Sequence, residues 1–362
     1  MAYFDLHQHL KNLEEHGLLR RITRLINKDT ELHPLVRWQY RGLPEEDRRA
    51  WLFENVTDAK GKRYTMPVVV GALAGKPEIY YLGMGCNSAE EMDARWKKAL
   101  AEPINPITVA NAKCQDVVIL GDELDKEGNG LDRFPVPIST PGFDNGPYTT
   151  CSHWITADLD TGIQNIGNYR GEIKARRRVG VFPSGLGQDV YLHWKKAQEK
   201  GVDLPAALVV GAPPIVSYVS VQKIPYGVDE VGVAGGMARE PIPMVKCKTV
   251  DIMVPGDAEI VVEGYLNTEY IEPEGPFGES HGYMHPRQLN PFMDVTAITH
   301  RKDAIYTSWL SQLTPSESSV IRKIGYDRLM LVHLRDECRI TSVLRVEMHE
   351  SLTNTYKLVI IQ

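Results

Sequence analysis

Two neighbouring stretches decide how this chain folds: Val254-Pro-Gly-Asp-Ala-Glu-Ile-Val-Val-Glu-Gly264 and Glu274-Gly-Pro-Phe-Gly-Glu-Ser-His-Gly-Tyr283. The apolar run in the first stretch predicts a buried strand over 258–263. The second stretch places Glu274 and Glu279 five residues apart, which on a strand would point them to opposite faces. Because the glycines and the proline between them permit a tight turn, we expect both carboxylates to reach one pocket.

Paired carboxylates have a chemical use when a pocket shields them from water. Their pKa values then move apart, so that one carboxyl group can stay protonated and act as a general acid. The residues alone are equally compatible with an acidic loop at the protein surface.

A second cluster is Asn165-Ile-Gly-Asn-Tyr-Arg170. An arginine beside a carboxylate pair tunes that pair, and its guanidinium can hold a carboxylate or a phosphate with two hydrogen bonds. The amide oxygen of Asn165 suits a hard cation. Spacing alone favours the simpler interpretation of a turn with a surface arginine.

A third cluster is Ile224-Pro-Tyr-Gly-Val-Asp-Glu-Val-Gly-Val-Ala-Gly-Gly236, in which two acids precede a stretch of small residues. Small residues allow the backbone to approach a flat or phosphorylated ligand closely. A Gly-x-Gly-x-x-Gly sequence after a strand and a Gly-Lys-Ser/Thr loop are both missing from the sequence. An ordinary dinucleotide-binding fold and a P-loop are therefore not predicted.

The length of 362 residues predicts two or three domains. Residues 1–115 have the pattern of a small α/β domain, and from residue 116 glycine and proline become frequent between short strands, which predicts a β-rich domain over 116–305. Residues 306–362 are expected to begin a third, α/β region.

The elements that we expect in these domains are local ones. They are a helix that starts after Asp5 and buries Leu6, Leu10 and Leu13, helices over 89–101 and 191–200, and strands over 66–70, 116–120, 206–210, 258–263, 294–300, 340–348 and 356–362.

Composition limits the classes of function. A net charge of −6 does not suit a nucleic-acid partner, and the sequence shows neither an apolar run of membrane-spanning length nor a secretory signal, so we expect a cytoplasmic protein with no membrane partner.

The basic cluster of Lys174 and Arg176 to Arg178 is interpreted as a solvated face. The five scattered cysteines are expected to be reduced. His7 and His9 are expected on the surface of a polar helix, and Gly282, Tyr283 and Pro286 exclude a helical metal pair at His281 and His285.

The three clusters, in this order, resemble the UbiD-type family of prenylated-FMN-dependent (de)carboxylases. The resemblance runs from Phe53-Glu-Asn-Val-Thr57 through Asn165-x-x-x-x-Arg170 and Pro225-x-Gly-x-x-Glu230 to the two opening stretches. It implies an α/β N-terminal domain, a β-rich split-barrel (flavin reductase-like) cofactor domain over 116–305, and the start of a C-terminal α/β region. Family members carry more residues at the C-terminus, so the resemblance also implies a truncated chain.

The resemblance further implies a catalytic network of Arg170, Glu274 and Glu279. It implies a divalent cation, manganese or magnesium, on Asn165, Glu230 and a third position that is usually histidine and here falls on Gln188; Asp189 could substitute if the loop shifts by one residue. A monovalent cation, potassium or sodium, would lie nearby. The implied cofactor-binding residues are Thr150, Asn168, Tyr169, Arg170, Gly187, Gln188, Ser220, Val221, Gln222, Lys223 and Glu230.

The implied activity is reversible, non-oxidative decarboxylation of an aromatic, heteroaromatic or α,β-unsaturated acid through a covalent prenylated-FMN adduct, with Glu279 as the proton donor. The partners would be the acid, CO2, a flavin prenyltransferase that supplies the cofactor, and further copies of the chain in a homodimer or larger homo-oligomer. Phe182, Ser184, Leu186 and Ser280 are expected to shape the substrate pocket. The alternatives are an FMN-dependent oxidoreductase and a non-catalytic subunit of a carboxylase complex.

Overall fold

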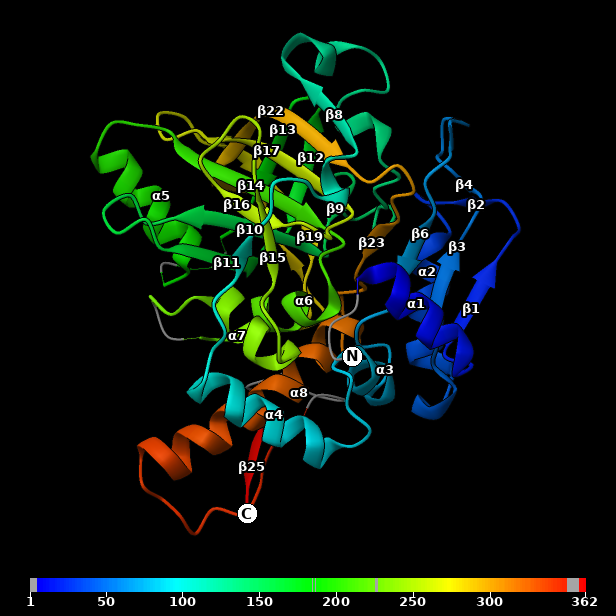
Figure 1. Ribbon diagram of the computed structural model, residues 1–362. Helices are drawn as coiled ribbons and strands as arrows, with labels where there is room; N and C mark the ends of the chain where they lie inside the picture. The colour runs from blue at the N-terminus through cyan, green and yellow to red at the C-terminus, as the bar shows by residue number, and fades with distance from the viewer. Residues whose placement is uncertain (1–4, 184, 186, 225–226, 350–357) are drawn as a thin grey trace.

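The structure is a computed structural model that describes residues 5–183, 185, 187–224, 227–349 and 358–362. The N-terminal part is built on a four-stranded mixed sheet in the order β1-β3-β6-β23, next to helices α1, α2 and α3 (Figure 1). The fourth strand comes from far along the chain, since Tyr306 to Ser308 pair in parallel with Val68 to Val70. The bounds are α1 Leu6–Glu15, β1 Leu19–Ile22, α2 Leu32–Gly42, β3 Ala50–Phe53, β6 Val68–Val70, α3 Pro77–Gly83 and β23 Tyr306–Ser308.

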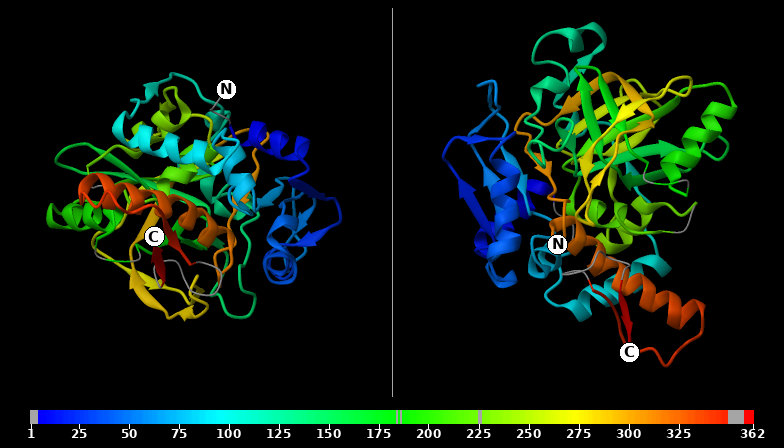
Figure 2. Two further views of the ribbon diagram at one scale, coloured as in Figure 1. Left: turned by 90° about the horizontal axis from the view of Figure 1, so that it is seen from below. Right: turned by 180° about the vertical axis from the view of Figure 1, so that it is seen from behind.

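The middle of the chain forms a strongly curved antiparallel sheet, a half-barrel, in the order β11-β10-β14-β17-β22-β13-β12-β9, with β8 paired to β22 (Figures 1 and 2). The strands are β8 Val117–Leu120, β9 Tyr148–Thr149, β10 Ser152–Ala157, β11 Gln164–Asn168, β12 Gly171–Ala175, β13 Arg178–Val181, β14 Leu204–Val210, β17 Ile260–Leu266 and β22 Phe292–His300.

Both faces of this sheet are covered. Along β14, Ala207 and Val209 pack in one hydrophobic core with helices α6 and α7, while Leu208 and Val210 point into a second core inside the curve of the sheet. Side chains alternate between the faces of a strand, so burial on both faces gives an uninterrupted apolar run. This is why the sequence between Ala206 and Val210 contains no polar residue.

Helices gather at one end of the half-barrel, where α7 and α8 pack with α4 (Figures 1 and 2). Their bounds are α4 Ala89–Ala101, α5 Asp189–Glu199, α6 Pro214–Ser220, α7 Glu230–Ala238 and α8 Glu317–Val332. Short strands complete the structure: β2 Ile26–Asn27, β4 Val56–Thr57, β5 Arg63–Tyr64, β7 Ile107–Thr108, β15 Pro243–Lys246, β16 Met253–Pro255, β18 Glu272–Glu274, β19 Phe277–Gly278, β20 Met284–His285, β21 Gln288–Asn290, β24 Val346–Met348 and β25 Val359–Ile361. Among the described residues, no helix combines the length and the apolar character that a membrane crossing needs.

Local signals predicted several elements correctly. Asp5 caps α1 through its side chain, and Leu6, Leu10 and Leu13 are buried below it. Helix α4 has the expected bounds, and the helix expected over 191–200 begins two residues earlier at Asp189. The cysteines are free, with four of the five buried. The arginines of the basic cluster form surface ion pairs, as a solvated face requires.

Three expectations were wrong. Strand β8 is not buried, because it lies at the edge of the half-barrel and exposes Val118 and Leu120. His9 is not on the surface: its ring is fully buried, and Nε2 lies 2.6 Å from the carbonyl oxygen of Ala72. The strand expected over 340–348 is limited to Val346–Met348, and of the strand expected over 356–362 only Val359–Ile361 is formed in the residues that the structure describes.

Candidate active site

A cavity of about 510 Å³ lies between the half-barrel and helix α8. Its wall contains every residue that the sequence assigned to cofactor binding, together with Asn165, Glu279, Phe182 and Ser280. These residues come from segments up to 130 positions apart, and the curved sheet brings them together. Glu274 is the exception, because its side chain is fully buried behind the cavity wall. Ser184 and Leu186, which were expected to shape the pocket, lie outside the described residues.

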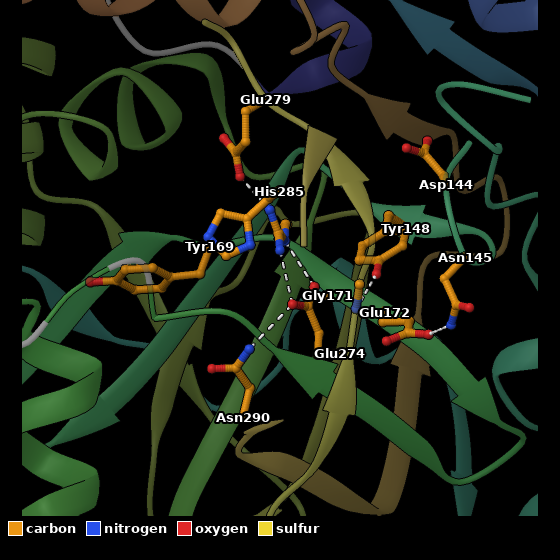
Figure 3. A network of polar contacts seen from close by, with 12 residues as sticks. Asp144, Asn145, Tyr148, Tyr169, Gly171, Glu172, Glu274, Glu279, His285 and Asn290 are labelled. Carbon is orange, nitrogen blue, oxygen red and sulfur yellow. Dashed lines mark hydrogen bonds and ion pairs between the residues drawn. The ribbon is translucent and has the colours of Figure 1, made fainter. Parts of the chain in front are cut away.

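The carboxylates of Glu274 and Glu279 point toward one another (Figure 3), and both of them bind Arg170. Its Nε donates to Oε1 of Glu274 at 2.8 Å and its Nη2 donates to Oε2 at 2.9 Å, while Nη1 binds the carboxylate of Glu279. Gly275 has a positive φ of 91°, which allows the chain to turn between the two acids. Both carboxylates therefore bind the same arginine, but only Glu279 reaches the cavity, so the prediction of one shared pocket is confirmed for Glu279 alone. The burial of Glu274 excludes an acidic loop on the surface.

The two carboxylates have different surroundings. Glu274 is fully buried and also accepts a hydrogen bond from Nδ2 of Asn290 at 3.2 Å (Figure 3). The side chain of Glu279 is about a quarter exposed and lines the cavity. Glu274 therefore holds Arg170 on the side away from the cavity. Glu279 is the carboxylate that a ligand in the cavity can contact.

Aromatic rings enclose the guanidinium of Arg170. Its Cζ lies 4.0 Å from the ring centre of Phe182, 5.0 Å from that of Phe277 and 6.0 Å from that of Tyr148. The ring of His285 packs against that of Phe182 in a tilted arrangement, with 4.6 Å between the ring centres. Apolar surroundings lower the local dielectric constant, so the ion pairs inside them are stronger than on the surface.

A second polar group lies on the cavity wall, where β11, α5 and α7 meet. Nδ2 of Asn165 donates to Oδ2 of Asp189 at 2.6 Å and to Oε1 of Glu230 at 2.7 Å, whereas Oδ1 of Asn165 is buried and has no hydrogen-bond partner among the described residues. Burial raises the pKa of Glu230 to about 7 and also raises the pKa of Asp189. The buried carboxylate of Glu230, the half-buried carboxylate of Asp189 and the amide oxygen of Asn165 form a set of hard oxygen donors that suits a divalent cation.

Gln188 does not belong to this group. It precedes the first residue of α5, and its Oε1 accepts a hydrogen bond from Nζ of Lys223 at 2.8 Å. Asp189, in the first turn of the helix, contacts Asn165 in its place. The structure thus places Asp189, the alternative third ligand, beside Asn165 and Glu230, and the binding of a cation by these residues stays a prediction.

The remaining cofactor candidates are fixed by the protein itself. Thr150 Oγ1 accepts a hydrogen bond from the backbone N–H of Trp309 at 2.8 Å, and Asn168 donates to the carbonyl oxygen of Thr150 at 3.1 Å. The hydroxyl of Ser220 lies 2.8 Å from Nδ1 of His153, which is fully buried and whose pKa burial lowers to about 3. A neutral imidazole therefore supports this part of the wall.

The glycines of the third cluster have another function than the expected one. They lie in helix α7, and a Cβ atom at Gly235 would come within 2.4 Å of the carbonyl oxygen of Ile104. One at Gly236 would come within 3.0 Å of Cα of Ala99 in α4. The small residues permit close packing of α7 on its neighbours and do not serve a ligand. Glu230, at the start of the same helix, does line the cavity.

Sequence reasoning missed the contribution of α8. Trp309, Ser311, Ser318, Ile321, Arg322 and Tyr326 line the cavity from a segment that no motif indicated. Phe277 was overlooked although it lies between the two glutamates. Asn290 shows no signal in the sequence, because its contact with Glu274 depends on the pairing of β18 with β21.

Comparisons with known proteins agree with this geometry. The family model of the 3-octaprenyl-4-hydroxybenzoate carboxy-lyase Rift-related domain matches residues 107–312, and that of the N-terminal domain of the same family matches residues 10–96. An uncharacterized protein of Aquifex aeolicus is 32% identical over 342 residues, which cover 88% of this chain and 67% of that protein. An uncharacterized protein of Synechocystis is 30% identical and is covered to 68%.

Solved structures have the same fold. An evolved dimeric form of the UbiD-class enzyme HmfF from Pelotomaculum thermopropionicum, in complex with prFMN, superposes with a TM-score of 0.83 and 29% identity over 95% of this chain and 75% of that chain. The closed form of Sedimentibacter hydroxybenzoicus vanillic acid decarboxylase has a TM-score of 0.87 over 100% of this chain and 74% of its own, and at 24% identity it shows the fold alone. Because the family models together match most of the chain, this protein belongs to the UbiD (3-octaprenyl-4-hydroxybenzoate carboxy-lyase) family.

Proposed function

We propose that this protein is a carboxy-lyase that reversibly decarboxylates an aromatic, heteroaromatic or α,β-unsaturated carboxylic acid with prenylated FMN as cofactor. The observation that carries the proposal is Arg170, which is bound to buried Glu274 on one side and to cavity-facing Glu279 on the other. Family membership supports the reaction class, and the HmfF structure contains prFMN.

In this proposal Arg170 binds and orients the carboxylate of the substrate. A guanidinium N–H donates a charge-assisted hydrogen bond to a carboxylate, which helps to fix the position of that carboxylate. Glu274 occupies Nε and Nη2, so a ligand can reach only the Nη1 edge, the edge that Glu279 contacts. The arginine thereby places the reacting carbon next to Glu279.

Glu279 is the proposed proton donor. Loss of CO2 from an unsaturated carbon leaves an electron pair that must receive a proton, and the acid that gives it has to stand beside that carbon. Glu279 is the carboxyl group of the network that lines the cavity. In the carboxylation direction the same group would remove the proton.

The cavity suits the cofactor in size and in charge. When bound, prenylated FMN would supply the electron-accepting site that decarboxylation at an unsaturated carbon needs, since no side chain offers one. Asn165, Asp189 and Glu230 would hold a divalent cation at the phosphate, and Lys223, whose Nζ contacts Gln188 and whose charge interacts with Asp189, would add a positive charge. Thr150, Asn168 and Ser220 would line the flavin.

The test is to express the protein together with a flavin prenyltransferase, purify it without air and determine the mass of the released flavin. Prenylated FMN in near-stoichiometric amount, with CO2 release from a panel of unsaturated acids, is the expected result. Ordinary FMN without CO2 release would favour an oxidoreductase, and a protein free of flavin would contradict the proposal.

A further inference from the structure

The cavity contains a cation that neither the proposed chemistry nor the proposed cofactor contacts use. Arg322 lies on helix α8 and lines the same cavity as Arg170 and Glu279. Its Nε donates to the carbonyl oxygen of Ser318 at 3.1 Å, which orients the guanidinium. Its two terminal nitrogens have no hydrogen-bond partner, and no carboxylate pairs with it, within the described ranges of the chain.

Other cations of the same helix differ from Arg322 in this respect. Lys323 pairs with Asp327 at 2.7 Å and with Glu347 at 3.5 Å, and Arg328 pairs with Asp93 at 2.6 Å. Neither of them lines the cavity. A half-buried guanidinium without a counter-ion costs free energy, and a ligand that brings a negative charge removes this cost.

Contacts around α8 join its first turns to the loop that carries Glu279. The backbone N–H of Leu313 donates to the carbonyl oxygen of Glu279 at 3.2 Å. Ser311, two residues before Leu313, has its hydroxyl 3.3 Å from the hydroxyl of Ser318. Ser318 is one helical turn before Arg322 on α8. Arg322 is thus joined to Glu279 by a short chain of contacts along the segment that precedes α8. The Asn165 group belongs to other elements, β11, α5 and α7.

We propose that Arg322 binds a second carboxylate of the substrate, so that the enzyme prefers dicarboxylic acids. This inference rests on the proposed function and names its substrate class: an unsaturated acid with one carboxylate at Arg170 and another at Arg322. The planar fork of arginine matches a carboxylate, and the hydroxyls of Ser311 and Ser318 on the same wall offer further donors.

The test measures binding, which does not require turnover. The affinity of the holoenzyme for benzoate is compared by calorimetry with that for isophthalate and terephthalate, which carry a second carboxylate in the meta or para position. The wild-type protein is expected to bind at least one diacid about 10- to 100-fold more tightly than benzoate, as one charge-assisted bidentate contact allows. Arg322→Met should abolish this preference and leave the affinity for benzoate within about threefold.

Two variants serve as controls. Lys323→Met removes the neighbouring cation that faces away from the cavity and should keep the preference, and Arg322→Lys should restore part of it, because lysine keeps the charge without the fork. The flavin content of each variant is measured by absorbance. Loss of flavin in Arg322→Met would assign Arg322 to the cofactor and overturn the inference, as would a wild-type protein that binds the diacids no better than benzoate. A holoenzyme that binds diacids through Arg322 but releases no CO2 would contradict the proposed function alone.

Discussion

Arg170 and Glu274 meet edge to edge: Nε lies 2.8 Å from Oε1 and Nη2 lies 2.9 Å from Oε2. The pair joins the link between β11 and β12 to strand β18, 104 residues further along the sequence, and Asn290 holds the carboxylate from a third segment. This leaves Nη1 of the arginine for Glu279 and for a ligand. The structure thus separates an anchoring carboxylate from a reactive one.

Glu274→Gln should lower the stability of the fold. The substitution leaves the buried Arg170 with an amide that offers it one acceptor instead of two, and breaking a buried ion pair costs about 3–5 kcal/mol. The free energy of unfolding, measured with urea, should fall by an amount of this order. Glu279→Gln should cost less than about 1 kcal/mol, since a partly exposed pair contributes little. If the two substitutions lowered the free energy of unfolding equally, Glu274 would not be the anchoring carboxylate of the pair.

Glu279→Gln should remove turnover and keep the cofactor. A glutamine cannot donate a proton to carbon, and general acid catalysis contributes about 10²- to 10⁴-fold to the rate. The expected result is a loss of kcat of at least this size, with an unchanged flavin spectrum and an unchanged mass of the released flavin. If the variant keeps its decarboxylation rate, another group supplies the proton.

Asp189→Asn should weaken the binding of a divalent cation, and Gln188→Ala should not. Asp189 contacts Asn165 beside Glu230, whereas Gln188 contacts Lys223. Removing one of two charged oxygen ligands should raise the Kd for manganese or magnesium at least about tenfold. The measurement is calorimetric titration of the metal into protein freed of cations. If Gln188→Ala raises the Kd for the metal more than Asp189→Asn does, Gln188 is the third metal ligand.

Glu317 should make stability depend on pH. This residue of α8 is fully buried and accepts hydrogen bonds from the backbone N–H groups of Gly71, Leu73 and Ala74. Burial nevertheless raises its pKa to about 7, above the value of 4.5 for a glutamate in an unfolded chain. The folded state therefore binds the proton more tightly, and the contribution of Glu317 to stability is complete below about pH 4.5 and is lost as the pH rises towards 7.

Glu317→Gln tests this linkage, because an amide does not titrate. The variant should be less stable at pH 5 by about 1–3 kcal/mol, since its NH2 group faces backbone donors. Its free energy of unfolding should fall less steeply than that of the wild type between pH 4.5 and pH 7. Unfolding curves in urea at several pH values measure both effects. Parallel pH profiles for the two proteins would show that Glu317 does not titrate in this range.

The sequence by itself determined the elements and residues whose signals are local. The capping of α1 by Asp5, the bounds of α4 and the turn at Gly275 follow from neighbours in the chain. The roles expected for Arg170, Glu274 and Glu279 depended on a pattern of residue types, and the structure brings these three side chains together.

Only the tertiary structure decided the rest. Which of Gln188 and Asp189 faces Asn165 depends on where α5 begins, and that start is set by packing against the sheet. The return of Tyr306 to Ser308 to the N-terminal sheet and the position of Arg322 in the cavity wall depend on contacts between residues far apart in the chain. Periodicity and turn signals report on a few neighbouring residues, so they do not contain this information.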